Sequence, residues 1–297
     1  MKEYPQTQEE FDERFATEEA CRDYLWRVRW PRWFQCPRCH RSAHRPAAGS
    51  SFHYCTECGH QASVTAGTLF ERTHMSLTTW FRGIWRVADP KWPVNALALQ
   101  RVLGLGSYRT AWTWLHKLRR VMVHLRHDRL SDRVEVHLTS LAGPGVRIPG
   151  VRTREGPLIA IAAEVKRGLI GHVRIEPIAV DGLRTFVSRA VEPCSVVITD
   201  GADVDGYTGL DGADYTHRRV RQYSRAQQVA SALRTWLPDA HHGGVSGKHL
   251  SYYLDEFTFR FNHRACRSQG KLFHHLIQRA VRVKPVHYGD VVEGARQ

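Results

Sequence analysis

The sequence predicts a multidomain protein of the α+β or α/β class, in which a small metal-binding module and a helical region precede a larger core of strands and helices. Two cysteine pairs predict the metal-binding module. Two apolar helical patterns around a glycine-containing turn predict the helical region, and short alternating segments after residue 130 predict the strands of the core. The chain has 297 residues, which is long enough for a large core and one or two small modules.

Residues 8–30 carry apolar side chains at roughly helical spacing, and Pro31 ends the pattern. We therefore expect one long helix here, packed beside the metal-binding module.

Residues 34–70 contain two C-x-x-C pairs that are separated by fifteen residues: Cys36, Cys39, Cys55 and Cys58. Each pair forms a tight turn with both thiolates on one side, and a β-hairpin between the pairs completes a tetrahedral zinc site. Gly59 directly follows the second pair, and residues 63–70 alternate like a strand that leaves it. Two disulfides in a secreted domain are the alternative, but seven cysteines in the whole chain and no expected signal peptide favour a zinc ribbon. Nearby histidines are expected on the surface, because four cysteines already satisfy zinc: His40, His44, His53 and His60.

Ser76 starts another helical pattern, which Pro90 and Pro93 end. Its aromatic stripe is expected to pack in a core. Residues 94–124 then predict two helices around the segment Gly-Leu-Gly-Ser at 104–107, as in a helix-turn-helix unit. The free side of the second helix carries Tyr108, Arg109, Thr113, His116, Lys117 and Arg120. Such side chains enter a major groove or hold phosphates in a helix-turn-helix, whereas an ordinary helical hairpin leaves them in solvent.

The charge of the chain favours the first of these interpretations. The formal net charge is +14 and the isoelectric point is near 9.8, so the expected partner is a polyanion. Residues 101–133 hold eight arginines and lysines against Asp128 and Asp132. The longest apolar run, residues 158–163, is too short to span a bilayer, so nucleic acid is favoured over a membrane and we expect a protein of a reducing cytoplasm.

The rest of the chain predicts strands at 133–140, 157–166 and 171–178, a helix at 183–191, a buried strand at 194–199, and helices at 225–237 and 248–263. This order, βββαβ followed by helices, is that of a ribonuclease H-like core. The chemistry associated with that core is two-metal phosphoryl transfer, with carboxylates on the first strand, the fourth strand and a late helix.

The candidate carboxylates fit this scheme only in part. Asp200 ends the buried strand, as the second ligand should, although an aspartate there is also a common turn former. On the first strand the valines face one way and Glu135, His137 and Thr139 face the other, so the central ligand position holds a histidine. Histidine is a poor magnesium ligand.

The late helix offers Asp255 and Glu256 as acids. Both also fit as residues between apolar turns, and Glu256 has the alternative of pairing with Arg260 one turn later.

Several longer motifs follow one another over roughly residues 15–280. They are Cys-Pro-Arg-Cys at 36–39, Cys-Thr-Glu-Cys-Gly-His-Gln-Ala-Ser-Val-Thr-Ala-Gly-Thr at 55–68, Tyr-Arg-Thr-Ala-Trp at 108–112, Val-Ile-Thr-Asp-Gly at 197–201, His-His-Gly at 241–243 and Tyr-Leu-Asp-Glu-Phe-Thr-Phe-Arg-Phe-Asn-His-Arg at 253–264. With them the chain resembles the bacterial insertion-sequence transposases of the ISXO type.

The resemblance implies four segments. An N-terminal helix and zinc ribbon (1–72) and a helix-turn-helix region (73–130) would recognise the terminal inverted repeats of an element in double-stranded DNA. A ribonuclease H-like integrase domain of the DDE type (131–282) would cut and join DNA with magnesium, and a tail (283–297) would follow. It also implies a homo-oligomer on DNA and a nucleoid-associated protein of the bacterial cytoplasm.

The chain departs from the family pattern at the catalytic positions. Where the family has Glu-Val-Asp-Glu-Thr, this chain has Glu-Val-His-Leu-Thr at 135–139, so His137 replaces the first aspartate and Leu138 its acidic neighbour. Asp200 is retained, and Glu256 or Asn262 is the candidate for the third ligand. Residues 225–237 contain no acid. Loss of a carboxylate that both metal ions share should reduce activity by orders of magnitude.

The leading hypothesis is therefore a transposase by descent that binds element ends and has impaired strand transfer. The first alternative is a non-catalytic, domesticated DNA-binding protein, such as a repressor of related elements. The second is a zinc-dependent scaffold that binds protein, which the basic charge disfavours.

Overall fold

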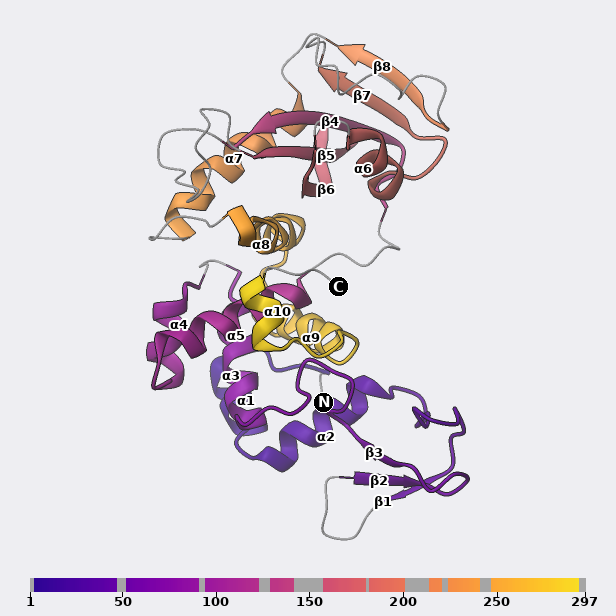
Figure 1. Ribbon diagram of the computed structural model, residues 1–297, viewed down its shortest axis with the longest axis vertical. Helices are drawn as coiled ribbons and strands as arrows, with labels where there is room; N and C mark the ends of the chain where they lie inside the picture. The colour runs from indigo at the N-terminus through magenta and orange to yellow at the C-terminus, as the bar shows by residue number, and fades with distance from the viewer. Residues whose placement is uncertain are drawn as a thin grey trace. The chain divides into compact units, whose positions relative to one another are not determined.

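The computed structural model describes residues 3–46, 52–90, 94–122, 129–141, 157–179, 182–200, 214–220, 224–240 and 247–293. The chain divides into two compact units (Figure 1). The first unit comprises Met1–Val121 and Cys266–Gln297, and the second comprises Met122–Ala265. Within the described ranges, no helix has the length and apolar character needed to cross a membrane.

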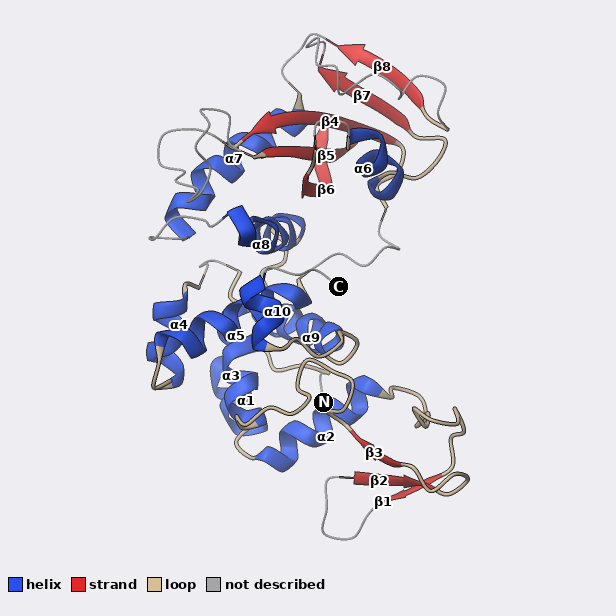
Figure 2. Cartoon of the chain, viewed as in Figure 1, coloured by secondary structure: helices blue, strands red, loops and turns tan. Residues whose placement is uncertain are grey.

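The first unit contains helices and a small sheet (Figure 2). Its helices are α1 (Gln8–Arg14), α2 (Glu18–Arg29), α3 (Leu77–Val87), α4 (Ala96–Leu103), α5 (Tyr108–Val121), α9 (Gln269–Ala280) and α10 (Tyr288–Glu293). Its strands are β1 (His44–Pro46), β2 (Phe52–Cys55) and β3 (Gln61–Ser63), which pair antiparallel in the order β1-β2-β3.

The single long helix predicted over residues 8–30 is wrong, because the segment forms two helices. Thr7 caps α1, and Thr17 caps α2 by accepting a hydrogen bond from the backbone N–H of Ala20 at 3.2 Å. Thr17 is followed by two glutamates, which favour the positive end of a helix dipole. The apolar pattern continues across the break because Phe11 and Phe15 face the same core as α2.

The strand predicted over residues 63–70 is also wrong. β3 ends at Ser63, and the following residues form turns, in which Gly67 has a φ of +71°. Arg29 holds the end of β3 by donating to the backbone oxygens of Ser63 and Val64 at 3.0 and 2.8 Å. Burial does not alternate here as it would in a strand, because Ala66 and Gly67 are exposed and the next three residues, 68–70, are buried.

The core of the first unit is aromatic and draws on both ends of the chain. Phe15 contacts the rings of Tyr24, Phe81 and Phe273, which come from α2, α3 and α9. The predicted stripe on α3 is buried, and Ser76 caps that helix as expected by accepting from the backbone N–H of Thr79 at 3.1 Å. Helix α9 therefore packs in the first unit, whereas the sequence grouped it with the segment 131–282.

The second unit is built on one sheet, whose strand order within the described residues is β6-β5-β4-β7-β8. The strands are β4 (Arg133–Ser140), β5 (Leu158–Lys166), β6 (Leu169–Pro177), β7 (Val196–Asp200) and β8 (Thr216–Val220). β4, β5 and β6 pair antiparallel, as expected for consecutive strands, and β7 and β8 add in parallel. β8 was not predicted, because its sequence Thr-His-Arg-Arg-Val lacks apolar alternation.

Helices cover both faces of this sheet. Helix α6 (Leu183–Ala190) packs on one face, where its apolar residues join Val134, Val136 and Leu138 of β4. Helices α7 (Arg225–Ala240) and α8 (Leu250–Asn262) pack on the other, against apolar residues of β5 and β6. A short 3₁₀ helix, η2 (Gly247–His249), precedes α8. The two separate apolar clusters confirm the predicted alternation on β4.

Candidate functional site

The four cysteines of the predicted zinc ribbon lie together. Their sulfur atoms are all within 4.8 Å of one another, with 3.7 Å between Cys36 and Cys58 and 3.5 Å between Cys39 and Cys55. A zinc ion with four thiolates at 2.3 Å in tetrahedral geometry separates the sulfurs by about 3.8 Å, so the spacing fits zinc. It is too long for a disulfide, in which the sulfurs are about 2.05 Å apart. The donor set therefore supports a structural zinc site.

Backbone hydrogen bonds shape the two halves of this site alike. His40 donates its backbone N–H to the oxygen of Cys36 at 2.9 Å, and Gly59 donates to Cys55 at 3.0 Å. Both residues have positive φ, +60° and +68°, immediately after the second cysteine of each pair. Burial opposes ionisation of Cys36, yet hydrogen bonds from backbone N–H groups and neighbouring thiols lower its pKa to about 7. A thiolate is the form that binds zinc.

An aromatic cluster attaches the ribbon to α2, as predicted. Trp26 stacks on Phe34 with ring centroids 5.6 Å apart and on His53 at 3.6 Å. Phe34 is buried beside Cys36 and Cys55. The predicted surface position holds for His40 and His44, which are exposed, whereas His53 is partly covered by Trp26.

The two helices predicted around residues 104–107 are α4 and α5. Asn95 caps α4 by accepting from the backbone N–H of Ala98 at 2.8 Å, and Gly104 ends it with a φ of +62°. Ser107 then accepts from the backbone N–H of Thr110 at 3.1 Å and so starts α5. The turn chemistry could be predicted because each of these residues is a standard helix terminator or cap.

Only the first turn of α5 is exposed. Tyr108 retains 54% of its exposure, and Arg109 and Thr110 are also exposed. Arg109 donates its Nε–H to the hydroxyl of Tyr288 at 2.5 Å, and its guanidinium lies 4.5 Å from the centre of that ring. Helix α10 thereby positions the arginine that the sequence placed on the DNA-facing side.

Further along α5 the expected free side is largely covered. His116 is fully buried, so its predicted exposure is wrong, and Thr113 is buried with its hydroxyl donating to the Arg109 oxygen at 2.8 Å. Lys117 and Arg120 are partly buried. The cover comes from α9 and α10, more than 140 residues later in the chain, which the periodicity of α5 could not reveal.

In the second unit, the polar face of β4 lies beneath α7. Glu135 accepts a hydrogen bond from the backbone N–H of Arg225 at 2.5 Å, at the start of α7. Arg234, two turns along α7, donates to the Thr139 hydroxyl and, at 3.1 Å, to the Ser140 oxygen. His137 lies between these contacts on the same face, partly buried and opposite Ile161 of β5.

Asp200 ends β7, next to β4 in the sheet. In the parallel pairing of β4 with β7, Val136 lies opposite Thr199, and the same offset carried one residue further puts the backbone of Asp200 beside His137. The sheet thus brings together the two positions predicted for the first and second ligands. Gly201 and the motif at 241–243 lie outside the described residues.

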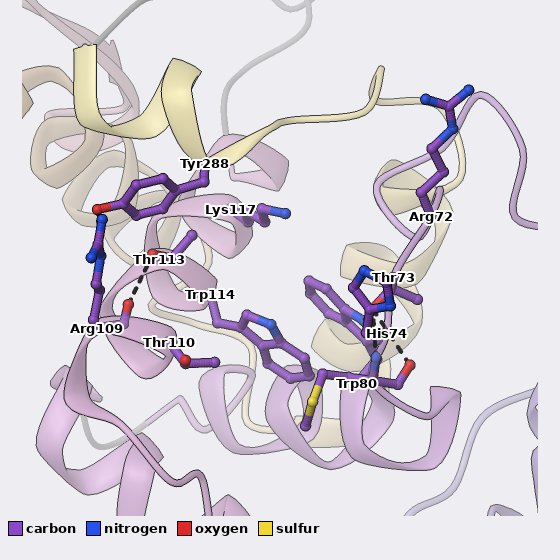
Figure 3. Close-up of a pocket in the computed structure, with 11 residues that line it drawn as sticks. Arg72, Thr73, His74, Trp80, Arg109, Thr110, Thr113, Trp114, Lys117 and Tyr288 are labelled. Carbon is purple, nitrogen blue, oxygen red and sulfur yellow. Dashed lines mark hydrogen bonds between the residues drawn. The ribbon is translucent and has the colours of Figure 1, made fainter.

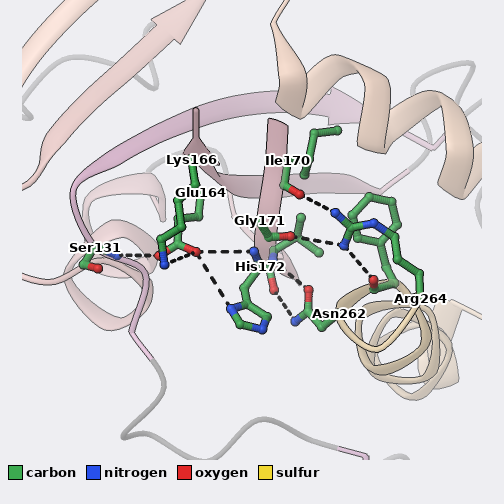
Figure 4. A network of polar contacts seen from close by, with 10 residues as sticks. Ser131, Glu164, Lys166, Ile170, Gly171, His172, Asn262 and Arg264 are labelled. Carbon is green, nitrogen blue, oxygen red and sulfur yellow. Dashed lines mark hydrogen bonds and ion pairs between the residues drawn. The ribbon is translucent and has the colours of Figure 1, made fainter. Parts of the chain in front are cut away.

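The two late candidates make structural contacts. Glu256 is fully buried and pairs with Arg260, whose Nε lies 3.0 Å from a carboxylate oxygen, as the i,i+4 alternative proposed. Asn262 accepts from the backbone N–H of Val173 at 2.8 Å and donates to its oxygen at 3.0 Å (Figure 4). Arg264 donates to the Gly171 oxygen at 3.2 Å in the same region.

These contacts hold Asn262 at β6, the edge of the sheet. Because neighbouring strands are about 4.8 Å apart, β6 lies roughly 10 Å from β4 and roughly 14 Å from β7. A magnesium ion binds its oxygens at about 2.1 Å, so Asn262 in this position does not share an ion with His137 or Asp200.

Two family models match this chain. Residues 129–262 match the ISXO2-like transposase domain, and residues 16–61 match the transposase zinc-ribbon domain. No curated protein and no solved structure matches it. The matched ranges contain the cysteine site and the sheet from β4 to α8.

Proposed function

We propose that this chain, which belongs to the insertion-sequence transposases of the ISXO type, binds double-stranded DNA at element ends and has lost efficient metal-dependent strand transfer. The alternative is a domesticated repressor, which would bind the DNA ends of related elements in the same way and would not cut them. Both readings place the protein on the bacterial nucleoid as a homo-oligomer.

DNA binding rests on charge and on the exposed start of α5. The chain carries a net charge of +14, and counterion release makes such a surface bind phosphates. We propose that α4 and α5 act as a helix-turn-helix, with Tyr108 and Arg109 at the DNA. Thr113 is too buried to contact a duplex, and Lys117 and Arg120 are less accessible than Arg109. The zinc ribbon braces this region through its packing on α2.

A ribonuclease H-like core is our proposal for the second unit. Its support is the strand order, in which β4 is central, β5 and β6 extend one side antiparallel, and β7 and β8 extend the other in parallel. In such a core the first two metal ligands stand on the central strand and its parallel neighbour, here at His137 and Asp200. We place the catalytic-type domain at residues 131–262 and the DNA-binding part at 1–130.

The face of β4 carries the argument for lost catalysis. Magnesium requires oxygen ligands, and the central position holds an imidazole. Glu135 is the acid on this face of β4. Its carboxylate accepts a hydrogen bond from the backbone N–H at the start of α7 and a long one, 3.4 Å, from the Arg133 guanidinium. Residues 225–238 of α7 contain no acid, and Arg234 approaches the other end of the face. Of the candidate carboxylates only Asp200 remains, and a two-magnesium site needs several oxygen ligands.

We further propose structural roles for Glu256 and Asn262. The first is fully buried and is neutralised by the partly buried Arg260, and the second binds the backbone of the edge strand β6. Edge strands expose unpaired backbone groups that favour aggregation, and a side-chain amide that binds both groups of Val173 covers part of that edge.

The test is nicking of labelled DNA that carries presumed element ends, with zinc-loaded full-length protein and added magnesium. Binding with no cleavage supports the proposal, whereas cleavage that Asp200→Ala abolishes would refute the loss of catalysis. His137→Asp is the matched gain-of-function variant. Leu138→Glu should not accompany it, because Leu138 packs in the apolar cluster with α6 and a buried carboxylate there would be unpaired.

A further inference from the structure

A pocket of about 450 Å³ lies within the first unit (Figure 3). It is bounded by α5, by Trp80 of α3, by the segment at 72–75 and by Tyr288 of α10. The indole rings of Trp80 and Trp114 form one wall and stack on each other at 4.0 Å with an interplanar angle of 16°. Tyr288 stands across from them, so two sides of the pocket are aromatic (Figure 3).

The charged side chains of the pocket are cationic. Arg72, Arg109 and Lys117 line it, and none of the lining residues is an acid. Arg72 is 83% exposed and has only a 3.8 Å contact with Glu71. Within the described part of the chain, the Lys117 ammonium makes no hydrogen bond or ion pair, and its side chain extends across the pocket (Figure 3). Burial lowers the pKa of Lys117, and Asp290 acts in the opposite direction. Among the described residues only the longer-range charge of Asp290 offsets the half-buried Lys117 ammonium, so an anion that enters the pocket can form a charge-assisted hydrogen bond with it.

The lining fits one class of ligand. Aromatic rings stack on nucleobases and are tolerant of their sequence, while arginine and lysine hold phosphates. The volume lies within the usual range for pockets that bind small molecules. Arg109 and Thr110 belong both to this pocket and to the exposed first turn of α5, so a DNA molecule docked on that turn lies at the mouth of the pocket.

We propose that the pocket binds one unpaired nucleotide of DNA, with its base against the aromatic lining and its phosphate at Lys117 and Arg72. The proposal rests on DNA binding by α5, stated above, and adds to it a site for a nucleotide outside the duplex stack. Extruding a base costs least where the base is already unpaired, so a bulge or a frayed end is the preferred substrate.

The test compares three labelled duplexes of the same sequence: fully paired, with one unpaired adenosine, and with one unpaired abasic nucleotide. The abasic duplex keeps the flexibility and the phosphate and lacks only the base. We expect the protein to bind the adenosine bulge at least about fivefold more tightly than the abasic one, the lower limit for stacking of one base. Equal Kd values for the two bulges would overturn the proposal and leave duplex binding intact. No binding to any of the three would refute DNA binding and, with it, this site.

Variants locate the effect. Tyr288→Ala should lower the ratio of the two Kd values toward one, because it removes an aromatic side of the pocket. Lys117→Gln and the surface variant Arg72→Gln should instead raise the Kd of both bulged duplexes relative to the paired duplex, because both bulges keep the phosphate. Lys271→Gln, an exposed lysine of α9 in the same unit, should keep that ratio. An unchanged ratio in Tyr288→Ala would place the base elsewhere, and unchanged Kd values in both Lys117→Gln and Arg72→Gln would place the phosphate elsewhere. Photo-crosslinking from a halogenated unpaired base should mark the peptides with Trp114 or Tyr288, and a crosslink confined to other peptides would also overturn the assignment.

Discussion

Asn262 allows a direct test of whether a residue of the motif at 253–264 binds metal or stabilises the fold. Its amide makes two hydrogen bonds to the backbone of Val173, a fully buried residue of β6. Each bond contributes about 1 kcal/mol net, and a buried backbone group left unpaired costs about 1–3 kcal/mol. Asn262→Ala should therefore destabilise the second unit by about 2–4 kcal/mol. For a unit of this size, that lowers Tm by roughly 4–16 °C.

Asn262→Asp separates the two roles. The carboxylate still accepts from the Val173 N–H, but its other oxygen faces the Val173 carbonyl, where an acceptor meets an acceptor. We expect a loss of about 1–3 kcal/mol. A metal ligand would respond differently, because aspartate binds magnesium better than asparagine, and magnesium would then raise the Tm of the variant.

The assay is thermal unfolding together with hydrogen exchange of the peptide that covers β6, with and without magnesium. Ser231→Ala, an exposed position of α7, is the matched control and should change Tm little. Faster exchange at β6 in Asn262→Ala supports the structural role. An unchanged Tm and unchanged exchange, or stabilisation of Asn262→Asp by magnesium, would refute the reasoning.

Three further predictions concern the first unit. Cys55→Ser or a strong chelator should remove the roughly one zinc per chain, measured by metal analysis, and unfold the ribbon, measured by tryptophan fluorescence near Trp26. Gly270→Ala should lower Tm strongly, because an added Cβ would lie 1.7 Å from the Pro5 oxygen, whereas Gly289→Ala meets no atom within 4 Å and should be tolerated. Arg109→Gln should weaken duplex binding and reduce the slope of log Kd against log salt by about 0.9, and an unchanged slope would contradict phosphate contact.

The parts of the fold that depend on local chemistry could be predicted. Four cysteines in two pairs determine the ribbon because the ligand spacing is set by one ion, and the structure brings their sulfurs together. Asn95, Gly104 and Ser107 determine where α4 ends and α5 begins, since caps act over one helical turn. Strand alternation on β4 predicted correctly that its valines share one face, which the structure shows to pack with α6.

What could not be predicted depends on residues far apart in the chain. His116 is buried on α5, a helix that α9 and α10 help to cover, and Arg279 of α9 donates to the Val121 oxygen at 3.3 Å. Nothing in residues 94–124 encodes that cover. The same holds for Asn262, whose partner Val173 lies 89 residues earlier. Its place in a motif with Glu256 made it a candidate ligand, and only the tertiary contact distinguishes the two roles.

The polar face of β4 shows how the fold would persist after the proposed loss of the metal site. In a magnesium centre, carboxylates crowd together and repel one another until cations bind, so such a site costs stability in the empty state. Here the central position is a histidine, and Glu135 lies at the start of α7, where a carboxylate at a helix N-terminus contributes about 0.3–1 kcal/mol. Arg234 ties the far end of the same face to α7. These contacts make the face a strand–helix contact. Since the zinc site and the exposed turn of α5 belong to the other unit, the proposed loss of catalytic ligands would leave the residues proposed to bind DNA untouched. This separation predicts that His137→Asp should change the response of DNA cleavage to magnesium without changing the Kd for duplex DNA. A change in that Kd would show that the two units are coupled.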